Sequence, residues 1–339
     1  MTTYPGRYLD LSRQELDSRA DEAWEMYRHC RVCPHACEVD RTQPGKRGIC
    51  ELGDRLVVSA SVRHFGEEPP LTGTRGVGNI FISSCNLSCD YCQNFQISQE
   101  HMGAESSYER TADAMLQLQS QGVHYIGWVS PSHVVPGLLK SLAIARHKGL
   151  RLPIIYNTNG YDSIEMLRLL DGVIDVYLPD LKYADDAIAM RYSHIKNYVE
   201  RSRNAVLEMF RQVGPLTLDQ EDGAQSGMLV RHLVLPGGMA GTWETLCFVA
   251  LELSPRVPLS LMSQYRPTYK AVDDPLLSRR ITGEEYQQAL NMARELGFEM
   301  VYTQDPDEDL HNLPDFRENE NPFPLDRAFN AESDVYFPE

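Results

Sequence analysis

The sequence lacks an excess of positive charge and lacks long apolar runs. Its 339 residues include 32 Lys and Arg against 48 Asp and Glu, a net charge of −16. Extended nucleic-acid surfaces need clustered Lys and Arg, and a membrane-spanning helix needs roughly 20 apolar residues. The opening stretch, MTTYPGRYLDLSRQELDSRADE, is too polar and acidic for a signal or transit peptide. We therefore expect a cytoplasmic protein that neither crosses a membrane nor binds nucleic acid.

Cysteine is nearly absent from the second half of the chain. Seven of the eight cysteines precede residue 93, and only Cys247 follows. In a reducing compartment such cysteines are typical of metal ligands rather than disulfides.

The first group of cysteines, which we call the four-cysteine knuckle, has the spacing C-x2-C-x3-C-x12-C and comprises Cys30, Cys33, Cys37 and Cys50. Four thiolates complete the coordination of a zinc ion or of a [4Fe-4S] cluster, and ligand softness does not separate the two. The spacing therefore predicts a closed metal site, with an auxiliary [4Fe-4S] cluster slightly favoured over zinc. A structural role and electron transfer both remain open.

The second group, the three-cysteine loop, has the spacing C-x3-C-x2-C in CNLSCDYC and comprises Cys85, Cys89 and Cys92. A cubane iron-sulfur cluster held by three protein thiolates keeps one iron open, by the logic that separates catalytic from structural zinc sites. A zinc knuckle with a distant fourth ligand is disfavoured, because the spacing C-x2-C would then be expected in both halves of the ligand set. The loop therefore predicts a reactive metal centre.

From residue 78 onward, β-rich runs alternate with helical ones. The expected strands are GNIFISS, HYIGWVS, PIIYNT, VIDVYLPD, MLVRHLVLP, PLSLMSQY and FEMVYTQ, and the expected helices cover residues 109–122, 135–149, 163–172, 241–254 and 282–297. This alternation predicts an α/β fold of parallel strands with crossover helices, in a barrel or a doubly wound sheet. Chemistry in such folds lies at the carboxyl ends of the strands, where the three-cysteine loop follows the first strand.

Three segments are expected along the chain. Residues 1–70 hold a helix over 12–29, which begins at the capping box of Ser12 and Glu15, and the four-cysteine knuckle. Residues 71–305 form the α/β unit. Residues 306–339 are acidic and rich in Pro and Asn, which predicts a mostly irregular, solvated tail.

The three-cysteine loop, with Tyr91 directly before its last cysteine, resembles the signature of the radical S-adenosylmethionine (SAM) superfamily. The segment FISSCNLSCDYCQNFQISQ is similar to an uncharacterised branch related to pyruvate formate-lyase activating enzyme, and CRVCPHACEVDRTQPGKRGIC and EEPPLTGTRGVGNI add to a likeness over residues 28–304. The resemblance implies a partial (β/α)6-type parallel barrel with a small N-terminal Cys-rich appendage. It also implies a [4Fe-4S] cluster on the loop, whose open iron binds SAM.

The resemblance implies an activity as well. One electron from an external flavodoxin- or ferredoxin-type donor would cleave SAM to methionine and a 5′-deoxyadenosyl radical, which abstracts hydrogen from a substrate. Activation of a glycyl-radical enzyme, or modification of a peptide or small molecule, both remain open. A zinc scaffold without turnover is disfavoured by the acidity and by the position of the loop.

Contacts to SAM are implied residue by residue, with Arg231 of VRHLVLPGG matched to the SAM carboxylate, which a guanidinium can grip with two hydrogen bonds. A structural ion pair is the alternative for the Asp and Lys of PDLKY. The family's Gly-Gly-Glu segment is replaced here by GWVSPSHVVPG, in which serines could supply oxygens. The other implied contacts are Tyr91, Ser130, Asn157, Thr158, Asp180 and Lys182.

Overall fold

Parallel strands dominate the computed structural model, which describes residues 4–45, 47–221, 223–304, 313–317, 321–323 and 335–336. The first four parallel strands pair in chain order: β2 (Val77–Ile82), β4 (Tyr125–Val129), β5 (Ile154–Thr158) and β6 (Val176–Pro179). The series continues through β8 (Ala224–Met228), which pairs with β6, and through β9 (Val230–Leu233), β10 (Leu259–Met262) and β11 (Val301–Thr303).

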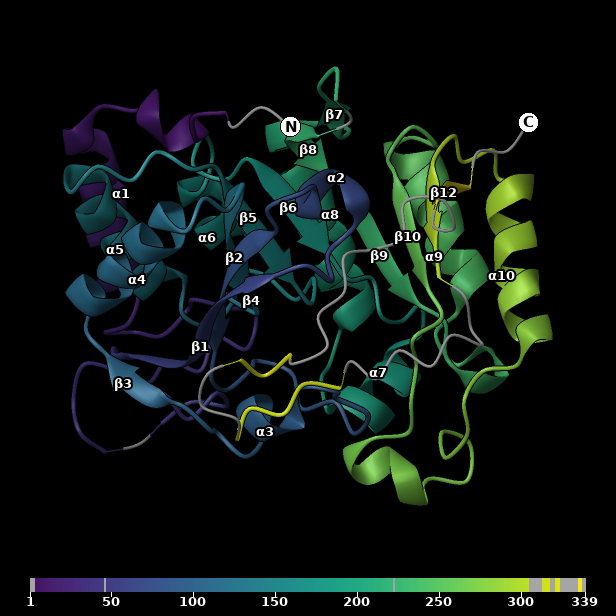
Figure 1. Cartoon of the computed structure of the whole chain (residues 1–339). Helices are drawn as coiled ribbons and strands as arrows, with labels where there is room; N and C mark the ends of the chain where they lie inside the picture. Colours follow the sequence, from purple (N-terminus) through teal and green to yellow (C-terminus); the bar gives the residue numbers. More distant parts are fainter. Residues whose placement is uncertain are drawn as a thin grey trace.

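A single residue, Leu229, separates β8 from β9, and the two sheets meet there. The backbone N–H of Leu229 donates to the carbonyl of Tyr177 at 3.1 Å, and the backbone N–H of Leu181 donates to the carbonyl of Arg231 at 2.9 Å. The strands therefore follow one another round a curved, laterally open wall, as Figure 1 shows. The predicted partial (β/α)6-type barrel is confirmed.

Antiparallel strands extend both edges of this wall. Strand β1 (Leu56–His64) lies before the predicted boundary at residue 70, yet it pairs with β2 beyond that boundary. The short strands are β3 (Ala104–Ser106) beside β1, β7 (Thr217–Leu218) beside β8 and β12 (Val335–Tyr336) beside β11. The strand expected near residues 55–65 is thus an antiparallel extension of the barrel wall.

Helices cover the outside of the wall, most of them where the alternation predicted. These are α4 (Tyr108–Ser120), α5 (Val135–His147), α6 (Ile164–Leu169), α9 (Thr242–Phe248), the π-helical turn Val249–Leu253 and α10 (Gly283–Glu295). A capping box of Thr282 and Glu285 begins α10. Ser12 caps α1 (Arg13–Glu25) by accepting from the backbone of Glu15 at 3.0 Å.

The remaining helices were not predicted. They include the one-turn helices α2 (Pro69–Thr72) and α3 (Phe95–Ser98), together with α7 (Asp186–Ser193) and α8 (Tyr198–Val213). Helix α8 buries Ala205, Val206 and Met209 at helical spacing, but the same face also buries Ser202 and Gln212. These polar residues interrupt the apolar stripe from which a helix is recognised.

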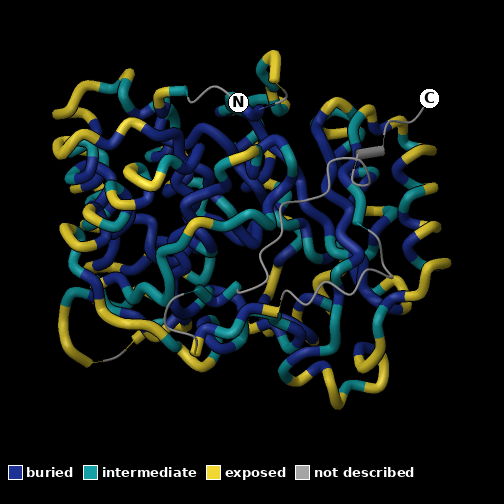
Figure 2. Tube along the Cα trace, in the orientation of Figure 1, coloured by how far each residue is buried: buried dark blue, intermediate teal, exposed yellow. Residues whose placement is uncertain are grey.

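Alternate side chains of each strand point to opposite sides of the wall. Inside, Val77, Ile155 and Val176 pack with Leu71 of α2. Outside, residues such as Ile80 join the large core beneath the helices, and Figure 2 shows the strands as the most buried part of the chain. This alternation decides which candidate site residues can reach the barrel interior.

Part of the predicted solvated tail packs on the barrel. Phe316 is buried, with its ring centroid 5.5 Å from that of Phe81, and its backbone donates to the side chain of Gln96 at 2.7 Å. Most of residues 306–339 lie outside the described residues. No helix in the described part of the chain is both long and apolar enough to cross a membrane.

Candidate functional site

The three-cysteine loop follows β2 at the carboxyl end of the parallel wall. Ser84, with a positive φ of 67°, turns the chain after β2, and its backbone donates to Ile97 at 2.7 Å. Farther along, the backbone of Asp90 donates to Tyr192 of α7 at 2.8 Å. The loop is therefore anchored by α3, which follows it directly, and by α7, which is distant in sequence.

Hydrogen-bond donors point at the sulfur atoms of the loop. Cys85 Sγ accepts from the backbone N of Leu87 and from Nδ2 of Asn159, both at 3.4 Å. Cys89 Sγ accepts from Oγ of Ser193 at 2.9 Å, and Cys92 Sγ lies 3.1 Å from Oγ of Ser98. Donors of this kind stabilise thiolates and tune iron-sulfur clusters. The residues present therefore fit a cluster held by these three cysteines.

Burial disfavours the free thiolates. It raises the pKa of Cys85 to about 11 and that of Cys89 to about 12, and it also raises the pKa of Cys92. The thiols would thus be protonated at neutral pH without a cation. Binding a metal deprotonates thiol ligands and releases those protons, so the loop is built to ionise only together with its metal.

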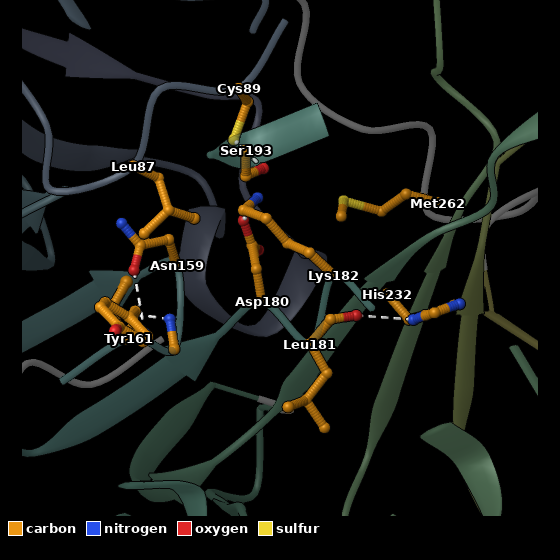
Figure 3. A network of polar contacts seen from close by, with 12 residues as sticks. Leu87, Cys89, Asn159, Tyr161, Asp180, Leu181, Lys182, Ser193, His232 and Met262 are labelled. Atoms are coloured by element: carbon orange, nitrogen blue, oxygen red, sulfur yellow. Dashed lines mark hydrogen bonds and ion pairs between the residues drawn. The ribbon is translucent and has the colours of Figure 1, made fainter. Parts of the chain in front are cut away.

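Asp180 and Lys182 form an ion pair beside this loop, with Lys182 Nζ 2.6 Å from Asp180 Oδ2. Their side chains are 23% and 17% exposed. Burial by itself would lower the pKa of Lys182, but the charges of Asp180 and Cys89 outweigh burial and raise it. Figure 3 shows Ser193, Lys182 and Asp180 lying below Cys89. Asp180 and Lys182 thus form the ion pair that was the alternative to SAM contacts. The pair also interacts electrostatically with Cys89 of the loop.

The segment NTNGY divides between two sides of β5. Ile155 packs inside the barrel, so Asn157, two residues on, faces the interior and is half-buried. Thr158 faces the other way, and its hydroxyl donates to Oδ2 of Asp162 at 2.5 Å. The structure therefore brings Asn157, but not the side chain of Thr158, to the interior.

Arg231 is committed to two carboxylates of its own chain. It is 9% exposed and contacts Glu67 Oε2 at 2.5 Å, and Glu68 through Nε at 2.8 Å and Nη2 at 2.5 Å. Burial would raise the pKa of Glu67, but the charges of Arg231 and His64 and the hydrogen bond from Asn79 lower it to about 2. The guanidinium predicted to bind the SAM carboxylate is therefore occupied by a structural ion-pair network. The signal for this network in the sequence is the pair of adjacent carboxylates in EEPP, Glu67 and Glu68.

Tyr91 belongs to the loop, whereas Ser130 directly follows β4. The buried ring of Tyr91 packs edge-on against Tyr183 and Tyr265, with centroids 6.3 and 5.9 Å away. Ser130 has a φ of 55°, is half-buried and donates its backbone N–H to Asn157 at 2.9 Å. Tyr91 thus packs the loop, whereas Ser130 lies at the mouth of the barrel.

Sequence reasoning missed the residues that hold the loop in place. Asn159 also donates to Oδ1 of Asn86 at 2.7 Å, and Asn86 Nδ2 donates to the carbonyl of Tyr161 at 2.7 Å. Asn159 belongs to the NTNGY segment, so that motif carried its signal. Ser193 lies at the end of α7, and no local pattern connects it to Cys89.

The four-cysteine knuckle packs directly on the three-cysteine loop. The hydroxyl of Ser84 donates to the carbonyl of Cys50 at 2.5 Å, and Nε2 of His35 lies 2.7 Å from the carbonyl of Asn86. Within the knuckle, Ile49 N donates to Cys37 Sγ at 3.5 Å. Cys30, Cys33 and Cys50 are buried and Cys37 is half-buried.

Glycine is required where the knuckle folds over Cys37. A Cβ added to Gly48 would lie 2.9 Å from Cys37 Sγ. Among the described residues, no three His, Cys, Asp or Glu side chains are grouped so as to hold one metal ion. A [4Fe-4S] cluster needs no such group around one ion, because each of its thiolates binds a different iron.

Comparison with known proteins agrees with this geometry. Residues 79–218 match the model of the radical SAM superfamily. This chain therefore carries a radical SAM domain. Two curated relatives are the uncharacterized proteins MJ0674 and MJ0808 of Methanocaldococcus jannaschii. MJ0674 is 29% identical over 297 residues, covering 85% of this chain and 80% of the relative. MJ0808 is 26% identical over 293 residues, covering 80% of each.

Two solved structures show more distant likeness. A radical SAM methyltransferase from Sphaerobacter thermophilus is 15% identical with a TM-score of 0.46, over 67% of this chain and 65% of that one. SuiB of Streptococcus suis, bound to the precursor peptide SuiA, is 13% identical with a TM-score of 0.42, over 66% of this chain and 47% of that one. At this distance neither supports the transfer of a substrate to this protein.

Proposed function

We propose that this protein cleaves SAM reductively at a [4Fe-4S] cluster held by Cys85, Cys89 and Cys92. The observation that carries the proposal is the loop itself: one buried and two half-buried thiols at the carboxyl end of a parallel barrel wall, each with a hydrogen-bond partner on its sulfur. When bound, the cluster and SAM supply a 5′-deoxyadenosyl radical that abstracts hydrogen from a substrate.

The chain's own residues hold and shape this site. Asn159 and Ser193 orient the thiolates of Cys85 and Cys89. Asn157 faces the interior, and the pair of Asp180 and Lys182 offers one acceptor and one cation within reach of the loop. These groups suit the hydroxyl, amino and carboxylate groups of SAM.

The substrate class follows from the proposed chemistry, which requires a C–H bond brought to the barrel interior. A glycine of a glycyl-radical enzyme, a peptide and a small molecule all supply such a bond, and we retain the three as proposals. The required electron is proposed to come from an external flavodoxin- or ferredoxin-type donor. A reducing, cytoplasmic setting would keep the seven clustered cysteines available as ligands.

We also propose that the four-cysteine knuckle binds a second metal group, either zinc or an auxiliary [4Fe-4S] cluster. Its support is the cysteine spacing, together with the burial of Cys30, Cys33 and Cys50. The contacts of Ser84 and His35 would let this group brace the three-cysteine loop.

The test is anaerobic reconstitution with iron and sulfide, followed by reduction in the presence of SAM. The proposal predicts broad absorption at about 400 nm from iron-sulfur charge transfer. It also predicts that 5′-deoxyadenosine forms. Reconstituted protein that contains a full cluster but forms no 5′-deoxyadenosine would contradict the proposed activity.

A further inference from the structure

Arg41 is a buried cation at the junction of the knuckle and the barrel. It is 1% exposed. Its guanidinium donates to the carbonyl of Gly53 through Nε at 3.0 Å and Nη2 at 2.7 Å, and to the carbonyl of His133 through Nη1 at 2.7 Å. Its Cζ lies 4.2 Å from the centroid of the Tyr27 ring. Each of these partners is neutral.

A guanidinium removed from water needs compensating negative charge, because carbonyl dipoles and an aromatic face replace its hydration only in part. No Asp or Glu of the described residues forms an ion pair with Arg41, in contrast to Arg231 with its two glutamates. The anion that compensates Arg41 must therefore come from another kind of group.

The sulfur atoms of the knuckle are the groups in the right place. Arg41 Nη1 lies 3.9 Å from Cys30 Sγ, and Arg41 itself lies within the knuckle, between Cys37 and Cys50 in sequence. Four thiolates around either a zinc ion or an oxidised [4Fe-4S] cubane leave a net negative charge. Such a centre would supply the anion that a set of neutral thiols does not.

We propose that Arg41 is the buried counter-cation of an anionic four-thiolate metal centre formed by Cys30, Cys33, Cys37 and Cys50. This inference rests on the second metal group proposed above and assigns its charge partner. Arg41 acts as a positioning residue, since it contacts the centre through a sulfur and binds no substrate.

The same guanidinium connects the centre to the catalytic end of the barrel. His133, whose carbonyl accepts from Arg41, places Nε2 3.1 Å from the carbonyl of Ser83. Ser84 in turn donates to the carbonyl of Cys50. A filled centre thus holds Arg41, the loop after β4 and the start of the three-cysteine loop in one buried network.

The test uses the full chain in which Cys85, Cys89 and Cys92 are all replaced by Ala, so that only the second centre contributes metal. Arg41→Met removes the charge and Arg41→Lys retains it. The matched control is Arg146→Met, because Arg146 of α5 likewise donates to backbone carbonyls, those of Leu9, Leu11 and Ser12. Bound zinc and iron are measured together with the rate of metal loss to EDTA and, where iron is present, the reduction potential.

We expect the parent, Arg41→Lys and Arg146→Met to retain the metal alike. Arg41→Met should lose metal to EDTA about 10- to 100-fold more readily, the usual effect of removing a partner of a metal ligand. A bound iron-sulfur cluster should also become harder to reduce in Arg41→Met, because removing a nearby cation disfavours the more negative state. Zinc alone in the parent would assign the zinc form of the centre, and iron would assign the cluster.

Three results would overturn the inference. The first is an Arg41→Met protein that holds its metal as firmly as Arg146→Met, with an unchanged potential. The second is an Arg41→Lys protein that loses metal as readily as Arg41→Met, which would assign the effect to the lost hydrogen bonds. The third is a parent protein that contains no metal; if wild-type protein still forms 5′-deoxyadenosine, the second centre fails while the proposed activity stands.

Discussion

The two cysteine groups of this chain differ in what surrounds their sulfur atoms. The three-cysteine loop receives side-chain donors from Asn159 and Ser193, which come from distant parts of the barrel. The four-cysteine knuckle has a backbone donor at Cys37 and the fully buried Arg41 at Cys30. Lys182, a cation beside the loop, is instead partly exposed and paired with Asp180.

We propose that this difference separates an exchangeable site at the loop from a closed site at the knuckle. Around the loop, half-buried polar groups such as Asn157 and Lys182 can meet an incoming ligand. Around the knuckle, the buried Arg41 already donates hydrogen bonds to protein carbonyls. The four thiols there are enough to complete the coordination of a metal. Cysteine can therefore serve two functions, according to the number of ligands around the metal and the access of other molecules to it.

The largest expected effect comes from removing the open site. Replacing Cys85, Cys89 and Cys92 together by Ala should abolish reductive formation of 5′-deoxyadenosine, because no thiolate remains to hold the cluster. Metal in the knuckle and the far-ultraviolet circular dichroism spectrum should be retained. If the triple variant still forms 5′-deoxyadenosine, the proposed activity does not reside in this loop.

Removing the closed site should affect stability first. Cys30→Ala with Cys33→Ala should lose the metal that SAM does not perturb and lower the free energy of unfolding by roughly 3 kcal/mol or more, since metal binding is coupled to folding. Some uncoupled SAM cleavage should persist. Elemental analysis, thermal unfolding and electron paramagnetic resonance with and without SAM measure these effects.

Two outcomes of that experiment would change the comparison. A variant that folds normally but loses all cleavage would make the knuckle an obligatory electron relay. A variant that keeps its full metal content would show that these cysteines are not ligands.

Arg231 provides a test between a SAM contact and a structural ion pair. Because Arg231→Ala leaves two buried carboxylates without their cation, it should lower the free energy of unfolding by about 3–5 kcal/mol. Loss of a SAM contact would instead weaken SAM binding by roughly 1.5–3 kcal/mol. Denaturant unfolding and calorimetry on the folded fraction distinguish the two, and a stable variant with weakened SAM binding would support the SAM contact predicted from the sequence.

The same network predicts a pH dependence. The pKa of Glu67 is lowered from 4.5 to about 2 in the folded chain, so its contribution to stability is present above about pH 4.5 and is lost as the pH falls toward 2. Glu67→Gln should therefore be less stable than wild type at pH 7 and lose less further stability between pH 4.5 and 2. Equal slopes in the two proteins would contradict this assignment.

The smallest effect is expected at Ser193. Ser193→Ala removes the hydroxyl that donates to Cys89 Sγ, which should cost about 1 kcal/mol and make the loop cluster harder to reduce. Ser141→Ala is the matched control, since Ser141 is equally buried and donates only to the carbonyl of Gly137 on α5. An unchanged cluster potential in Ser193→Ala would show that this donor does not tune the site.

The sequence predicted the strands of the barrel wall but not all of the contacts that their side chains make. Strands β2 and β4–β6 were recognisable because each is a short apolar run between helical segments. Helix α8 escaped notice because Ser202 and Gln212 lie on its buried face. Arg231 was matched to a motif, but the carboxylates that occupy it are more than 160 positions away in the chain.

The sequence by itself determined the inventory of chemistry: three thiols in one tight loop, four in another, and parallel strands that place the first loop at a carboxyl edge. These follow from local spacing, which the chain carries without folding. Only the tertiary structure decided which side chains serve those thiols. Ser193 reaches Cys89 and Arg41 reaches Cys30 because packing brings their elements together, and burial then makes each unpaired charge or donor costly enough to require its partner.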